Sequence, residues 1–195
     1  MDEQGARGNF IFTLIKFILF LIIFCFLAEV TKEFWREVRS AKDLKLTTLV
    51  LPVLCAFGFY TFLTDLNEIY KKIQNFFFRS SFFSLVFPSL LILAALGYFF
   101  LPKIMKASYD RDVFIFIGGF LFTVHLIFIA RETKGHTFSA VIHYLFIFSI
   151  LYILNLMLFG LYLKIAFKLE IGKVALDGMR NGAILIQNIF TQIRK

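Results

Sequence analysis

Five long runs of apolar residues, separated by short segments that carry most of the charges, dominate the pattern of the chain. The runs cover residues 9–30, 46–66, 81–101, 113–130 and 138–167. A helix of about 17–25 apolar residues is long enough to cross a hydrocarbon core of about 30 Å. The runs lack the alternation of apolar and polar positions that a strand of a membrane barrel needs. The pattern therefore predicts an all-α, polytopic integral membrane protein with about five transmembrane helices.

A different pattern covers residues 171–195, where apolar positions recur with the period of a helix. One stripe holds Ile171, Ala175, Met179, Gly182, Ile186, Ile189 and Ile193, and the charged side chains lie elsewhere. This predicts a C-terminal amphipathic helix after a single transmembrane domain in residues 1–170. Gly178 and Gly182 have the G-x-x-x-G spacing that lets another helix approach. The helix is expected either to lie in the plane of the headgroups or to dock on a partner subunit.

The connecting segments are too short to hold folded domains of their own. They cover roughly residues 31–45, 67–80, 102–112 and 131–137. Aromatic and apolar residues alternate with basic ones in residues 67–80, which predicts a short helix at the membrane interface. Pro52 and Pro88 fall inside the second and third apolar runs, and each is expected to loosen or kink its helix.

Composition and charge agree with a membrane protein. Hydrophobic residues make up 59% of the chain, mean hydropathy is +0.81, and only 17% of residues are charged. The net charge is +8, and a nucleic-acid-binding protein would gather that charge in one basic patch. Here Lys and Arg are scattered through every connecting segment. This distribution favours contact with the headgroups of the lipid bilayer and argues against nucleic acid as a partner.

The distribution of basic residues also predicts an orientation. Thirteen Lys and Arg residues lie in residues 31–45, 102–112 and 168–195, against six in the N-terminal segment and the two remaining connectors. The positive-inside rule therefore predicts that the N-terminus is outside and the C-terminus is on the cytoplasmic side. Asp2 and Glu3 stand where a secretory signal would be basic, so we expect the first run to stay as a membrane helix.

Polar residues inside the apolar runs are candidates for function, because a polar group in hydrocarbon raises the free energy. Lys16 lies seven residues after Asn9, about 10 Å below the outer surface at helical rise. It is expected to extend back toward the headgroups, or else to form an ion pair or contact a substrate. Asn155 lies near the middle of the fifth run. We expect its amide to hydrogen-bond to a neighbouring or partner helix, with contact to a ligand or pore as the alternative.

Two histidines raise a specific chemical hypothesis. His125 lies six residues before Arg131, and His143 lies six residues after Thr137. An antiparallel hairpin places both about 9 Å deep. Two imidazoles at one depth on adjacent helices are the axial ligands that a b-type haem needs. The alternative is that each histidine forms hydrogen bonds between helices and that the chain holds no cofactor.

Three function classes follow from these observations. The runs contain no nucleophile beside a base, no carboxylate pair and no spacing typical of metal ligands, so we expect neither a catalytic site nor a metal site. The favoured class is a non-catalytic accessory or scaffolding subunit, with other integral membrane subunits as partners. The second is a small transporter, channel or lipid-handling protein, in which Lys16, Asn155, Glu29 and Asp65 would line one cavity. The third is an electron-transfer subunit with haem b on His125 and His143.

Overall fold

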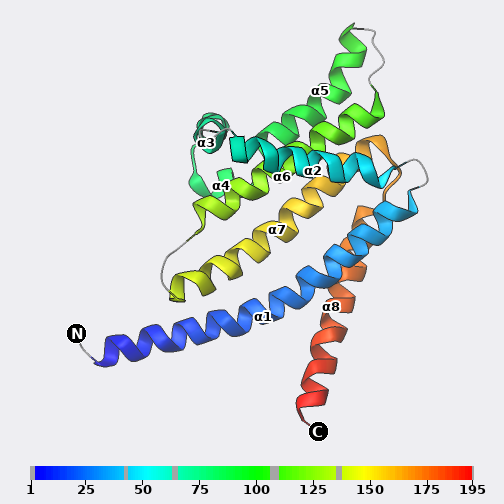
Figure 1. Cartoon of the computed structure of the whole chain (residues 1–195). Helices are drawn as coiled ribbons and strands as arrows, with labels where there is room; N and C mark the ends of the chain where they lie inside the picture. The colour runs from blue at the N-terminus through cyan, green and yellow to red at the C-terminus, as the bar shows by residue number, and fades with distance from the viewer. Residues whose placement is uncertain (1–2, 42–43, 63–65, 106–109, 135–137, 195) are drawn as a thin grey trace.

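The computed structural model describes residues 3–41, 44–62, 66–105, 110–134 and 138–194, and regular structure in these residues is entirely helical. The helices are α1 (Glu3–Ser40), α2 (Leu46–Phe62), α3 (Leu66–Phe77), α4 (Ser81–Val86), α5 (Ser89–Met105), α6 (Arg111–Glu132), α7 (Phe138–Ala166) and α8 (Ile171–Ile193). Figure 1 shows their arrangement as a bundle from which α1 and α8 project. The predicted all-α class is confirmed.

Three helices in the described residues are long and apolar enough to cross a membrane. They are Ile11–Ser40 within α1, Arg111–Glu132 and Ser139–Ala166 within α7. A fourth is counted if α2 and α3, whose axes differ by 109°, form one broken span. Helix α5 is apolar but shorter over Ser89–Phe100. The five predicted spans thus correspond to three or four helices of spanning length, and these helices indicate a membrane-embedded protein.

The third predicted span, residues 81–101, is not one helix. Helix α4 ends before Phe87 and α5 begins after Pro88. Phe87 is extended, with φ −108° and ψ 116°, because the ring of a following proline disfavours the helical region. Pro52 behaves differently, since α2 continues through it and its ring packs against Gly119 of α6. Only one of the two prolines therefore interrupts its helix.

The first helix is longer than the apolar run that predicted it. Residues 31–45 were expected to connect two spans, but α1 continues to Ser40. Oppositely charged side chains three residues apart, such as Glu29 and Lys32 at 3.0 Å, stabilise this extension. Its apolar side is buried, with Phe34 2% exposed. Residues 31–40 therefore form a helical extension with one charged and one packed face.

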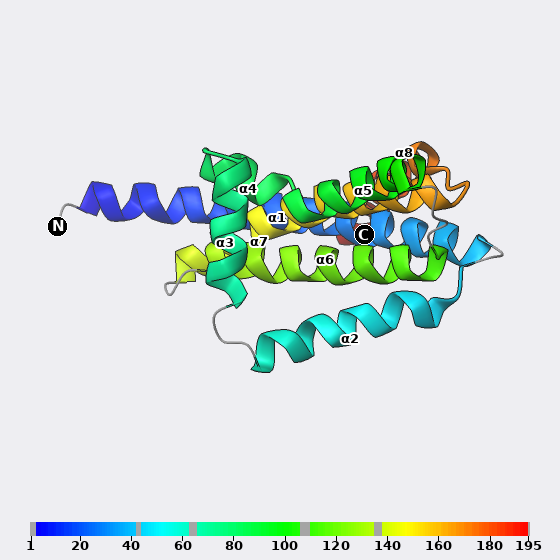
Figure 2. The same cartoon turned by 90° about the horizontal axis from the view of Figure 1, so that it is seen from above.

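The long helices pack side by side in parallel and antiparallel pairs. Helices α6 and α7 form an antiparallel hairpin, α1 runs parallel to α7, and α2 runs parallel to α6 (Figure 1). The start of α1 accordingly meets the start of α7, where the hydroxyls of Thr13 and Ser139 are 3.0 Å apart. Helix α3 lies across one end of the bundle (Figure 2). We call this the α3 end and the opposite one, where α7 turns into α8, the α8 end.

Aromatic side chains fill the space between α6 and α7. The rings of Phe114 and Tyr162 stack with centroids 4.1 Å apart, and those of Phe122 and Phe159 with centroids 4.5 Å apart. The hydroxyl of Tyr162 donates a hydrogen bond to the carbonyl of Phe114 at 2.7 Å. Gly118 permits this contact, because a Cβ there would collide with the Tyr162 ring. Helix α6 is therefore the packed centre of the bundle.

Candidate functional site

The first feature is the crossing of α1 and α8, which contains the two glycines of the predicted G-x-x-x-G spacing. A Cβ added at Gly178 would lie 2.8 Å from Cα of Val30, and one at Gly182 would lie 3.1 Å from Cα of Phe26. The two backbones therefore approach as the G-x-x-x-G spacing predicts. The helix that the structure places there is α1 of the same chain. Met179, which the predicted stripe includes, faces away from this contact and is 61% exposed.

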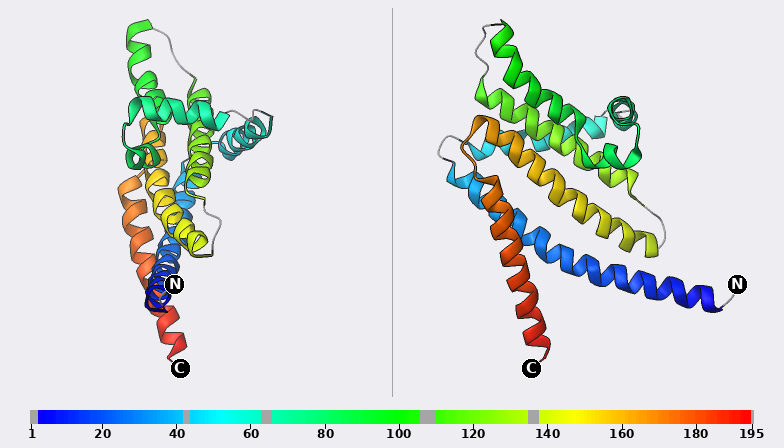
Figure 3. Two further views of the ribbon diagram at one scale, coloured as in Figure 1. Left: turned by 90° about the vertical axis from the view of Figure 1, so that its left-hand side faces the viewer. Right: turned by 180° about the vertical axis from the view of Figure 1, so that it is seen from behind.

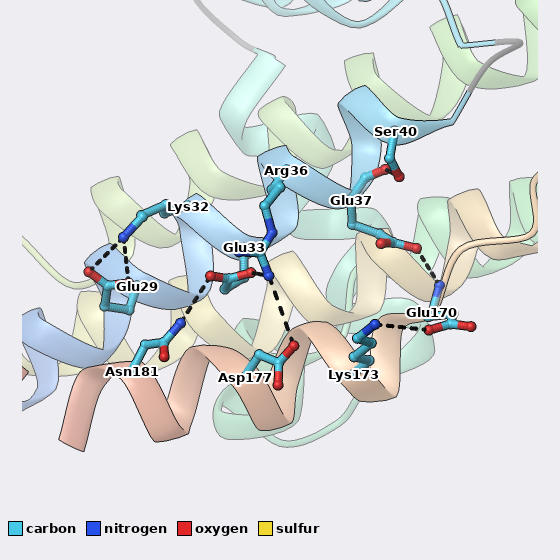
Figure 4. A network of polar contacts seen from close by, with 10 residues as sticks. All are labelled: Glu29, Lys32, Glu33, Arg36, Glu37, Ser40, Glu170, Lys173, Asp177 and Asn181. Atoms are coloured by element: carbon cyan, nitrogen blue, oxygen red, sulfur yellow. Dashed lines mark hydrogen bonds and ion pairs between the residues drawn. The ribbon is translucent and has the colours of Figure 1, made fainter. Parts of the chain in front are cut away.

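A polar network surrounds this crossing (Figure 4). The side chain of Glu33 is only 2% exposed, forms an ion pair with Arg36, and accepts a hydrogen bond from Nδ2 of Asn181 at 3.0 Å. Arg36 also lies 3.9 Å from a carboxylate oxygen of Asp177. A buried carboxylate is tolerated only when charge and hydrogen bonds compensate its lost hydration. The compensating charge comes from Arg36 of α1 and the hydrogen bond from Asn181 of α8, so the hydrogen bond is made only where the two helices cross.

The start of α8 is also tied to α1. The carboxylate of Glu37 accepts a hydrogen bond from the backbone N–H of Glu170 at 2.8 Å. Glu170 is the N-cap of α8 and its own side chain makes no capping bond. A carboxylate beside a helix N-terminus interacts favourably with the helix dipole. Helix α1 therefore places an anion beside the start of α8 and holds its N-cap residue.

Beyond the crossing, the two helices diverge. The first half of α1 and the last half of α8 point away from each other (Figures 1 and 3). One side of α1 lies against α7, where Thr13 meets Ser139, and the rest of this half of α1 is uncovered. No residue from 11 to 29 is buried. Large apolar side chains on α8 are also uncovered, with Phe190 63% exposed. We call residues 11–25 and 183–194, which lie beyond the glycine contacts of the crossing, the α1–α8 arm.

The second feature is a buried polar cluster around His125, which has no exposed surface. Its Nδ1 lies 2.9 Å from the hydroxyl of Tyr70 and 3.2 Å from Nε2 of Gln74, both on α3. Its Nε2 lies 3.2 Å from the backbone carbonyl of Leu85 on α4. The cluster therefore joins α6 to the two short helices at the α3 end, and His125 forms hydrogen bonds between helices.

Hydrogen-bonding chemistry assigns the protons of this cluster. A carbonyl can only accept, so Nε2 of His125 carries the proton and donates to Leu85. Nδ1 of the neutral ring then accepts, and the Tyr70 hydroxyl donates to it. Gln74 donates in turn to the Tyr70 oxygen, at 2.8 Å. The remaining amide oxygen, Oε1 of Gln74, is buried and has no partner among the described residues.

His143 does not join this cluster. Its side chain is exposed on α7 and its Nδ1 lies 3.4 Å from Nζ of Lys16 on α1. The structure therefore brings Lys16 to His143 but does not bring His143 to His125. Both ring nitrogens of His125 already have partners within the chain, so iron ligation there would require one of those bonds to break. Among the described residues no three metal-ligating side chains converge.

The remaining predicted polar groups lie apart. Nδ2 of Asn155, which is fully buried, donates to the carbonyl of Leu151 in its own helix at 2.9 Å, and its Oδ1 has no partner among the described residues. The predicted bond from Asn155 to a neighbouring helix is therefore not made within this part of the chain. Glu29 pairs with Lys32, and Asp65 lies outside the described residues. The described members of the predicted transport set thus have separate partners.

Comparisons of the chain with protein-family models, with curated proteins and with solved structures gave no match. Function must therefore be inferred from the geometry. The His125 cluster directs its hydrogen bonds inward and is covered by α3. The ion pair of Lys71 on α3 with Glu132 on α6, at 2.7 Å, holds α3 in place. The α1–α8 arm, in contrast, offers apolar surface outward at an angle set by the crossing.

Proposed function

We propose that the chain is a non-catalytic accessory or scaffolding subunit of a membrane assembly, and that the α1–α8 arm is its docking surface for other membrane chains. The observation that carries this proposal is the uneven burial of the spanning helices. Half of the most apolar stretch of α6 is buried inside the chain, whereas none of the corresponding stretch of α1 is. Helix α1 therefore contributes an apolar span in which no residue of the most apolar stretch is fully covered by the chain's own bundle.

The polar network at the crossing supports a partner in addition to lipid. Removing the Glu33 carboxylate from water raises the free energy of the folded chain. Such a group restricts the geometry of a contact more than an apolar residue of similar size would. Beyond Gly182 the angle it sets has little effect on packing within the chain, because Ile184 and Phe190 of α8 are exposed. An arm held at a fixed angle allows another chain to bind it in one defined orientation.

Purification from the native membrane in mild detergent tests this proposal. We expect mass spectrometry to find other membrane chains in stoichiometric amount, and the absorption spectrum of the same sample to lack a Soret band. The test variant is a chain that ends at Gly182, which keeps the contacts of Gly178 and Gly182 with α1 but lacks the projecting part of α8. We expect it to lose partner chains. A lone, colourless chain would contradict the proposal, and a Soret band would favour the haem alternative.

A further inference from the structure

A cleft opens between α1 and α2 at the α8 end of the bundle. Its volume is about 530 Å³ and it is lined by Lys32, Trp35, Arg36, Arg39 and Val50. Three of these five side chains are cations and the other two are apolar. The four lining residues of α1 lie just beyond the apolar run of residues 9–30, at the level where a membrane helix emerges among the headgroups, and Val50 lies near the start of α2.

The three cations share one face of α1, because residues four and seven positions apart in a helix are neighbours. Two of them pair with carboxylates, Lys32 with Glu29, and Arg36 with Glu33 and, at 3.9 Å, with Asp177. Arg39 is exposed and pairs with no carboxylate among the described residues. The side chains that line the cleft therefore include three cations and no carboxylate, and the guanidinium groups are suited to bidentate contact with phosphate.

Trp35 forms the apolar wall on the α1 side. It is partly buried and its ring packs edge-on against Phe34, with centroids 6.2 Å apart at 79°. Tryptophan is favoured at membrane interfaces because its indole combines apolar area with an N–H donor. Val50 of α2 supplies the opposite wall. An anionic headgroup could place its phosphate among the cations and its apolar part against these two side chains.

We propose that this cleft binds a phosphate-bearing anionic group, supplied either by a phospholipid headgroup or by free phosphate. Basic pockets between membrane helices are known to recognise such headgroups. The inference does not depend on the proposed scaffolding function, because it rests on α1 and α2 and not on the α1–α8 arm.

Fluorescence of the full chain in nanodiscs tests this proposal directly, since Trp35 is the one tryptophan of the chain. Phosphatidylglycerol is added to phosphatidylcholine discs in one series, and inorganic phosphate is added to pure phosphatidylcholine discs in another. We expect a saturable change in Trp35 emission in at least one series. Arg39→Gln should weaken the response about fivefold, the effect typical of one cation near a lipid surface. Lys72→Gln should leave it unchanged, because Lys72 is exposed on α3 at the opposite end.

The two series distinguish the sources. A response to phosphatidylglycerol alone assigns the site to a lipid headgroup, and a response to inorganic phosphate assigns it to the free anion. Lys32→Gln serves as a second variant and should weaken the same response. The proposal is overturned if neither addition gives a saturable change, or if both cleft variants respond like Lys72→Gln.

Discussion

Gly178→Ala is expected to lower the free energy of unfolding by about 1–3 kcal/mol, the range typical of overpacking in a well-packed contact. The added Cβ would lie 2.8 Å from Cα of Val30. A clash with backbone cannot be relieved by turning a side chain, so α8 would have to move away from α1. The shift would also strain the contacts of Glu33 with Asn181. Titration with sodium dodecyl sulfate in mixed micelles, followed by Trp35 emission, measures the change.

Gly172→Ala is the matched control for this prediction, because both glycines lie in α8 and receive the same methyl group. A Cβ at Gly172 meets nothing within 4 Å. Alanine has the higher helix propensity, so this variant should be unchanged or more stable by up to about 1 kcal/mol. Equal stability of Gly178→Ala and Gly172→Ala would show that α8 does not pack on α1 as described.

His125→Phe should destabilise the chain by about 2–4 kcal/mol, because it leaves the carbonyl of Leu85 and the hydroxyl of Tyr70 buried without their partner. Phenylalanine keeps an aromatic ring at the position, so the loss reports the hydrogen bonds more than the volume. Amide hydrogen exchange should rise in α3 and α4, which the histidine joins to α6, and much less in α8. The same detergent titration measures the stability.

His143→Phe provides the comparison. His143 is exposed and its ring lies 3.4 Å from Lys16, so this change should alter stability by less than about 1 kcal/mol. If the two variants lost the same stability, or if His125→Phe left exchange in α3 unchanged, the hydrogen-bond cluster would not hold the α3 end together.

The sequence predicted the helices better than their breaks. Apolar runs locate a helix because every backbone group in lipid must be satisfied within it, and α6 and α7 follow their runs closely. The two prolines look alike in the sequence but differ in the structure. Pro88 separates α4 from α5, whereas α2 continues through Pro52. Whether a helix continues through a proline depends on tertiary contacts, such as the one with Gly119, which the apolar pattern does not record.

The candidate sites were predictable in part. The spacing of Gly178 and Gly182 predicted a close helix contact but not that α1 would make it, since any helix can use such a face. His125 was expected either to bind haem or to bond between helices. Its partners Tyr70 and Gln74 lie four residues apart in a segment that was predicted to be a short interfacial helix, and nothing local shows that this helix folds over α6.

The buried carboxylate was missed for a related reason. Glu33 lies among alternating charges in residues 31–45, a pattern typical of a solvated segment. Its burial follows from α8 folding back along α1, with Asn181 as a partner far away in the sequence. The one local signal is the apolar spacing of Val30, Phe34 and Val38, all buried in the structure. That period of four would have extended the first helix to its observed end.

Photo-cross-linking in the native membrane tests most directly whether the α1–α8 arm docks a partner. A photoreactive phenylalanine replaces Phe12 or Phe190 on the arm, and Phe100 on α5 as a control of similar exposure, since the three are 65%, 63% and 51% exposed. We expect discrete cross-links to other protein chains from Phe12 and Phe190, and lipid adducts alone from Phe100. Lipid adducts alone from all three positions would contradict the account.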